Sequence, residues 1–263
     1  MTPGTTWSVF TKPWPTLAAP ELASVVHAMG LTAVELPVRP GCAVEPEHAA
    51  DALPRYAAEL AEHGVVISSV AADPTEAVLA GCRAAGVDLV RMMARIDGDH
   101  RAGIATWHRR LDALVEPVAR YGVAVGLQPH EGPYVPTALA MMELLDPLPS
   151  KGFGLVWDAG HEGLGGDDPR RSIDATYERI LQVNLKNARW VPTDLTDAAG
   201  QPRRRPEWVA GGEGSCDWGV VLHHLARHGY GGPFCLPAEY SAEQADVSRL
   251  VRDDHALARS LFH

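Results

Sequence analysis

Four residues with a side-chain oxygen end apolar runs in the second half of the chain. They are Gln128 in VAVGLQ, Asp158 in FGLVWD, Asn184 in ILQVN and Glu239 in FCLPAE. If these runs are parallel strands, their carboxyl ends meet at one edge, where residues on the inward parity face one another. Two carboxylates and two amides suit a hard divalent cation, so we expect a Mg²⁺ or Mn²⁺ site here. The alternative is that these residues are strand-end caps and loop anchors.

Three further polar residues follow these positions closely. Lys186 lies two residues after Asn184 and shares its inward parity. A lysine inside a barrel is costly unless it is paired or contacts an anionic substrate. His130 and His161 follow Gln128 and Asp158 by two and three residues. Since imidazole both donates and accepts protons, we expect Lys186, His130 and His161 to act at the site. The alternative for His161 is that it only fixes the glycine-rich loop.

A last group is assigned to substrate binding. Glu35 points inward by parity, and Tyr240 adjoins Glu239. Arg39 and Arg91 lie at or beyond the ends of their apolar runs, where a guanidinium suits a phosphate or carboxylate. Surface pairing is the alternative for the arginines, and Glu35 could simply pair with Lys186 or Arg91.

Short apolar runs alternate with longer amphipathic ones along the chain, which predicts the elements that position these residues. Strands are expected at Trp7–Phe10, Ala33–Leu36, Val65–Ala71, Val87–Met93, Val123–Gln128, Phe153–Asp158, Ile180–Lys186 and Phe234–Glu239. Helices are expected at Glu21–Gly30, Pro46–Gly64, Pro74–Gly86, His100–Gly122, Thr137–Leu145, Pro169–Ala175, Asp217–Gly229 and Ala242–Leu261. Eight strand–helix units in this length favour an α/β fold, a closed (β/α)8 TIM barrel. An open doubly wound sheet is the alternative, but no G-x-G-x-x-G follows the first strand.

We expect one barrel domain over residues 1–263, with one long irregular segment at about 188–215. That segment is too long for a plain connection, so it is expected to be a lid or an interface element. Pro237 lies inside the last expected strand, where it removes a ladder hydrogen bond. A bulge near Glu239 would reconcile the two.

Composition restricts the possible partners. A chain of 263 residues with 46% hydrophobic residues can bury a large core. Its formal net charge of −10 repels a phosphate backbone, so no nucleic-acid partner is expected. The sequence shows neither a signal peptide nor an apolar run of ~18 residues, so no membrane partner is expected either. The four cysteines are far apart, and free thiols fit a cytoplasmic location.

Several stretches together resemble the xylose isomerase-like barrel superfamily, in particular its sugar phosphate isomerase/epimerase branch. They are LTAVELPVRPG, GLQPHEG, VWDAGHEGLGGDDP, QVNLKNARW, GEGSCDWGVVLHHLARHGYGG and CLPAEYS, and they span almost the whole chain. The resemblance implies a divalent metal held by Glu, Asp, His and Glu at the ends of strands five to eight. By position these ligands become Gln128, Asp158, Asn184 and Glu239, and His161 matches the substrate-side histidine.

Two of these positions depart from the family pattern. Gln128 replaces a glutamate that shuttles a proton in typical ketose epimerases, and an amide is no base at neutral pH. Asn184 replaces an imidazole, which weakens affinity for softer metals such as zinc.

The sequence thus predicts a divalent-metal-dependent isomerase or epimerase that transfers a proton next to a carbonyl of a sugar or polyol-like small molecule. Glu239 would act as base, as metal ligand or as both, with Lys186, His130 or His161 as the second proton relay. One alternative is a metal-dependent lyase or dehydratase that uses the same enolate chemistry. Another is a metal-free binding or accessory protein on the same barrel. A homodimer is a further expectation.

Overall fold

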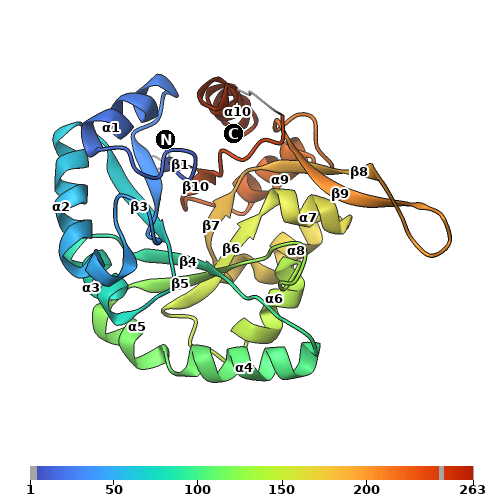
Figure 1. Cartoon of the computed structure of the whole chain (residues 1–263), viewed down its shortest axis with the longest axis horizontal. Helices are drawn as coiled ribbons and strands as arrows, with labels where there is room; N and C mark the ends of the chain where they lie inside the picture. Colours follow the sequence, from blue (N-terminus) through green and yellow to red (C-terminus); the bar gives the residue numbers. More distant parts are fainter. Residues whose placement is uncertain (1–4, 243–245, 263) are drawn as a thin grey trace.

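Eight parallel strands form a closed barrel in the computed structural model, which describes residues 5–242 and 246–262 (Figure 1). The barrel strands run in the order β1-β10-β7-β6-β5-β4-β3-β2. Their bounds are β1 Trp7–Phe10, β2 Ala33–Pro37, β3 Val66–Ala71, β4 Leu89–Met93, β5 Ala124–Gln128, β6 Phe153–Asp158, β7 Ile180–Asn184 and β10 Phe234–Leu236. The predicted fold class is therefore confirmed.

Helices cover the outside of the barrel, in the sequence intervals between the strands (Figure 1). They are α1 Ala19–Ala28, α2 Ala49–Glu62, α3 Glu76–Ala85, α4 His100–Asp112, α5 Val115–Tyr121, α6 Ala138–Leu145, α7 Ala159–Gly165, α8 Pro169–Thr176, α9 Trp218–Arg227 and α10 Val247–Leu261, with short 3-10 turns at Pro46–His48 and Tyr177–Arg179. The strands lie between this layer and the barrel interior. All residues of β2 and β6 are consequently buried, and these runs are apolar apart from Glu35 and the terminal Asp158.

Two helical regions differ from the sequence prediction. The helix expected over His100–Gly122 is divided into α4 and α5, because Pro117 offers no N–H to the carbonyl of Ala113 and its ring crowds that carbonyl. The glycine-rich stretch after β6, expected to be non-helical, forms α7. Asp158 caps this helix by accepting a hydrogen bond from the backbone N–H of His161 at 3.1 Å.

The segment expected to be irregular at 188–215 contains an antiparallel hairpin. Its strands are β8 Asn187–Thr196 and β9 Pro202–Val209, and the hairpin projects from the barrel (Figure 1). Pro192, Pro202 and Pro206 interrupt any regular alternation, which hides these strands from a period-two reading. A two-stranded sheet tolerates proline because each strand has a free edge.

The last barrel strand ends at Leu236, one residue before Pro237. Ala238 then adopts a left-handed backbone with φ of 56°, which turns the chain before Glu239. The Pro237 conflict is therefore resolved by termination of the strand rather than by a bulge within it. The last helix was expected from Ala242; α10 begins at Val247, and residues 243–245 lie outside the described part of the chain.

Within residues 5–242 and 246–262, none of the helices combines the length and the apolar character that a bilayer crossing requires.

Candidate active site

The four predicted strand-end residues lie together at the mouth of the barrel. Gln128 Nε2 donates a hydrogen bond to Asp158 Oδ2 at 2.5 Å. Lys186 Nζ lies 3.0 Å from Glu239 Oε2 and 3.9 Å from Asp158 Oδ2. Asn184 lines the same cavity as Gln128, Lys186 and Glu239. Inward parity thus identified three strand-end residues that meet in space, and Glu239 joins them from the turn after β10.

The amide of Gln128 has an orientation that its neighbours fix. Its Oε1 accepts a hydrogen bond from Arg91, while its Nε2 donates to Asp158. A guanidinium can only donate and a carboxylate can only accept, so the reverse orientation would place like groups together. The side of Gln128 that faces Asp158 is therefore an N–H group, which repels a cation.

A divalent ion held by the four predicted ligands does not fit this arrangement. Asn184 Oδ1 already accepts from Gln182 Nε2 at 2.9 Å, and the ammonium of Lys186 lies between the two carboxylates. Positive charges also exceed negative ones at the mouth. The cationic side chains are Lys12, Arg39, Arg91 and Lys186, and the carboxylates are Glu35, Asp158 and Glu239. The expected Mg²⁺ or Mn²⁺ donor set is thus not formed by these side chains as they lie.

Glu35 and Arg91 form a buried ion pair beneath the cavity. Arg91 Nη2 lies 2.7 Å from Glu35 Oε2, and Arg91 Nε donates to both carboxylate oxygens at 2.9 Å. Glu35 also accepts from Ser69 and Gln182, and its side chain has no exposed area. Burial by itself lowers the pKa of Arg91, but Glu35 outweighs it and raises that pKa. Glu35 therefore braces Arg91, as the pairing alternative anticipated, and does not itself line the cavity.

Glu239 holds two ammonium groups at the rim of the mouth. Lys12 Nζ lies 2.8 Å from its Oε1, and Lys186 Nζ bonds its other oxygen. Burial would raise the pKa of Glu239, but Lys186 and then Lys12 outweigh it and lower the pKa to about 2. Glu239 is thus ionised and only weakly basic at neutral pH. The sequence analysis did not predict Lys12 as a site residue, although it shares the parity of Phe10 at the end of β1.

His130 and His161 pack against each other with ring centroids 4.3 Å apart. His130 Nδ1 lies 2.8 Å from the carbonyl oxygen of Glu131, whereas His161 Nδ1 accepts from the N–H of Glu131 at 3.2 Å. His161 is buried, and its Nε2 has no hydrogen-bond partner among the residues that the structure describes. Burial, followed by the charge of Lys186, holds the pKa of His161 well below its usual value, so the ring is neutral at neutral pH.

Trp208, which sequence reasoning missed, forms part of the wall around Lys186. Lys186 Nζ lies 4.2 Å from the centre of the Trp208 ring, and the same ring meets His161 edge-on at 5.2 Å. A Cβ on Gly160 would lie 2.9 Å from Lys186 Cγ and 3.3 Å from Trp208 Cζ3, so glycine permits this close packing. Trp208 belongs to β9, where no periodic signal marked it.

Asn187 anchors the hairpin directly after Lys186. Its Nδ2 donates to the carbonyls of Gly211 and Cys216 at 2.7 Å, and its Oδ1 accepts from the N–H of Cys216 at 3.1 Å. A Cβ on Gly214 would lie only 2.0 Å from Asn187 Oδ1, so no other residue fits there. The GEGSC segment thus fixes the base of the hairpin that carries Trp208.

The remaining predicted substrate residues lie in different places. Arg39 is half-buried at the cavity and lies over the Phe10 ring, and burial followed by Arg91 lowers its pKa. Among the described residues, no carboxylate forms a salt bridge with Arg39. Tyr240 donates its hydroxyl to Asp254 Oδ2 at 2.9 Å on α10, so the expected substrate contact is replaced by a structural one.

One chain of polar contacts encircles the mouth. It passes in order through Glu35, Arg91, Gln128, Asp158, Lys186, Glu239 and Lys12. Donors and acceptors alternate along it, and Gln128 is the member that accepts on one side and donates on the other. A closed parallel barrel with ionisable groups gathered at the carboxyl ends of its strands has the architecture of the TIM-barrel class, whose enzymes carry their active sites at this face.

The chain belongs to the xylose isomerase-like TIM barrel family, whose sequence profile matches residues 23–261. It is 30% identical to the rhizopine catabolism protein MocC of Rhizobium meliloti over 154 aligned residues. The aligned region covers 56% of this chain and 46% of that protein. It is 27% identical to the inosose dehydratase of Bacillus velezensis over 136 aligned residues. This aligned region covers 49% of this chain and 45% of that enzyme. These matches span about half the length of either relative.

The fold is also that of solved sugar epimerases. D-psicose 3-epimerase from Clostridium cellulolyticum superposes with a TM-score of 0.75 at 12% identity, over 98% of this chain and 100% of that one. The family profile over residues 23–261 confirms the family that the sequence resembles.

Proposed function

We propose that this enzyme transfers a proton next to the carbonyl of a sugar or polyol-like substrate, as an isomerase or epimerase. The observation that carries the proposal is the hydrogen bonding of Glu131 to both histidines. A carbonyl only accepts, so Nδ1 of His130 bears a hydrogen, and in the neutral form of the ring Nε2 is free to take a proton. A backbone N–H only donates, so neutral His161 carries its hydrogen on Nε2.

One residue thus sets two opposite tautomers in adjacent rings. His130 lines the cavity and serves as general base, taking the proton from the carbon next to the carbonyl. The electron pair left on that carbon forms the enediolate double bond and places negative charge on the carbonyl oxygen. His161 Nε2–H is a donor without an acceptor, suited to that oxygen. The hydroxyl proton of the deprotonated carbon passes to the former carbonyl oxygen, and return of the abstracted proton to the former carbonyl carbon completes an isomerisation.

Lys186 supplies the positive charge that the proposal assigns to the developing oxyanion. Its ammonium is buried, held by two carboxylates and covered by Trp208, so it is already oriented before the reaction. The expected Mg²⁺ or Mn²⁺ is not needed for this role, since the ammonium already lies between Asp158 and Glu239. Glu239, expected to be the base, is instead a positioning residue for Lys186 and Lys12.

Arg39 indicates an acidic substrate. Arg91 directs its guanidinium to Glu35 and Gln128, whereas Arg39 lines the cavity without a carboxylate partner in the described part of the chain. A phosphate or carboxylate group on the substrate would complete its pairing.

Dehydration is the second candidate. Gln128 leaves the site with no second carboxylate base on β5, and elimination needs one base and one acid rather than a base on each face. The similarity to inosose dehydratases points the same way. In this case the His130 base takes the same proton, and a β-hydroxyl leaves as water.

Proton exchange in D2O tests the proposal. Keto sugars, their phosphates and inososes are incubated with the enzyme and followed by NMR, with and without prior chelator treatment. We expect deuterium at the carbon next to the carbonyl, together with isomer formation, and no effect of the chelator. General base catalysis contributes about 10²–10⁴-fold, so His130→Gln should slow exchange at least about 100-fold.

His63→Gln, at an exposed histidine on the end of α2, is the control and should leave exchange unchanged. Unchanged exchange in His130→Gln would remove the assigned base. Loss of water from the substrate in place of isomer formation would establish the dehydratase. Activity that disappears with chelator and returns with Mn²⁺ would contradict the role given to Lys186.

A further inference from the structure

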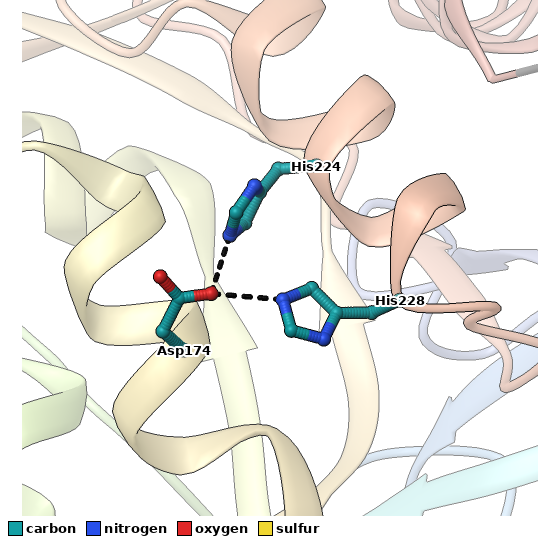
Figure 2. A group of neighbouring side chains, drawn as sticks. All are labelled: Asp174, His224 and His228. Atoms are coloured by element: carbon teal, nitrogen blue, oxygen red, sulfur yellow. Dashed lines mark hydrogen bonds and ion pairs between the residues drawn. The ribbon is translucent and has the colours of Figure 1, made fainter.

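Two helices on the outside of the barrel bring two imidazoles and a carboxylate together, away from the mouth (Figure 2). His224 lies on α9 and His228 directly follows it, four residues later, so both rings emerge on the same helix face. Asp174 comes from the neighbouring helix α8. Figure 2 shows both rings directed at the same carboxylate.

The three side chains converge on one atom. His224 Nε2 lies 2.6 Å and His228 Nε2 lies 2.8 Å from Asp174 Oδ1. Tyr177 holds His228 from the other side, because its hydroxyl donates to the His228 carbonyl at 2.9 Å and the two rings lie 4.6 Å apart, tilted by 30°. The imidazoles keep the pKa of Asp174 below its usual value, so this carboxylate is ionised at neutral pH.

We propose that Asp174, His224 and His228 bind one divalent transition-metal ion of the Zn²⁺ class. Zinc takes imidazole nitrogen and carboxylate oxygen at about 2.0–2.2 Å, in a tetrahedron whose ligand atoms lie about 3.3 Å apart. The three ligand atoms here all lie within 4.8 Å of one another. A small outward shift of the exposed Asp174 side chain opens the space for the ion.

The protons balance without a further reactant. A carboxylate only accepts, so each ring carries a hydrogen on Nε2 in this arrangement. On metal binding this hydrogen moves to Nδ1 through solvent, and the Nε2 lone pair binds the ion. Asp174 Oδ1 exchanges two hydrogen bonds for one metal bond, and water takes the fourth position.

The ligand set selects the class of metal. It contains one carboxylate and two imidazoles, whereas hard ions such as Mg²⁺ and Ca²⁺ rely on several oxygen ligands. Imidazole nitrogen favours Zn²⁺, Co²⁺ and Ni²⁺. Because the ligands come from two helices, the bound ion would tie α8 to α9.

Metal titration of the full chain tests this inference. Chelator-treated protein is titrated with Zn²⁺ in competition with a chromophoric chelator, and with Co²⁺ while the visible spectrum is recorded. We expect one equivalent of Zn²⁺, a four-coordinate Co²⁺ spectrum and a higher Tm. Asp174→Asn, His224→Gln and His228→Gln should each lose that equivalent or weaken it at least about tenfold.

His223→Gln changes a third imidazole of α9 and is the matched control, which should bind as the wild type does. Asp174→Asn alters an exposed side chain of the same shape, so its result does not depend on tolerance in the core. Equal losses in His223→Gln and His228→Gln, or wild-type binding in Asp174→Asn, would overturn the site. Because His130 and His161 are untouched, failure here leaves the proposed function standing.

Discussion

At the scale of single residues, the buried pair of Glu35 and Arg91 sets the geometry of the mouth. The Arg91 side chain is 5% exposed and that of Glu35 0% exposed, so neither charge has water to solvate it. Arg91 also fixes which way the Gln128 amide faces. The orientation of the Arg91 and Gln128 side chains thus depends on Glu35, which does not line the cavity.

Glu35→Gln should destabilise the enzyme by about 3–5 kcal/mol, because it leaves a buried guanidinium without its counter-charge. Urea denaturation measures this loss as a lower midpoint with the slope unchanged. Glu47→Gln makes the same chemical change at an exposed site and should have little effect. A loss below about 1 kcal/mol would show that Arg91 finds another partner.

Parity along the strands was sufficient to bring Gln128, Asp158 and Asn184 together from the sequence, whereas Glu239 reaches them from beyond the end of β10. Parity does not predict which atoms of these side chains face one another. The Gln128 amide is oriented by Arg91, from β4, and Lys186 approaches Asp158 only because Gly160 leaves room. The sequence analysis expected Lys186 at the site, but residue types alone did not place its ammonium between Asp158 and Glu239.

At the scale of elements, the β8–β9 hairpin supplies a wall of the site that the barrel itself lacks. Asn187 and Gly214 fix its base, and Trp208 covers Lys186 and His161. The sequence placed a lid or interface element here, but its strands are largely exposed and contain prolines, so they show no buried periodicity.

Trp208→Ala should lower kcat/KM about tenfold, since a desolvated cation–π contact contributes about 1–2 kcal/mol and its loss admits water to Lys186. Steady-state kinetics on the substrate found by proton exchange provides the measurement. Trp190→Ala removes a tryptophan from β8, one that bonds Leu164 instead, and serves as control. Equal losses in both variants would assign the effect to the hairpin fold rather than to the covered ammonium.

At the scale of the whole molecule, the fold followed from alternating strand and helix signals, because a parallel barrel buries every strand on both sides. The observed element boundaries differ from the predicted ones near two prolines. Pro117 divides the fourth helical region, and β10 ends before Pro237. A cytoplasmic location and a homodimer stay predictions from composition and resemblance.

Acid stability should depend on Glu239. Its folded pKa of about 2 lies below the value of 4.5 for a free glutamate, so the folded state gains stability above pH 4.5 and loses it as the pH falls toward 2. The loss amounts to up to about 3 kcal/mol. Denaturation series between pH 6 and 2 should therefore show Glu239→Gln approaching the wild type as the pH falls. A constant gap between them, like that expected for Glu47→Gln, would contradict this linkage.

The polar contacts from Glu35 to Lys12 form one continuous series at the mouth, in which each donor is paired with an acceptor. A glutamate in place of Gln128 would bring its carboxylate against that of Asp158. The neighbouring side chains would then have to reorient. We therefore expect Gln128→Glu alone to disturb these contacts, and coordinated changes of its neighbours to be needed to restore them. Converting this mouth to another chemistry is a task for several residues at once.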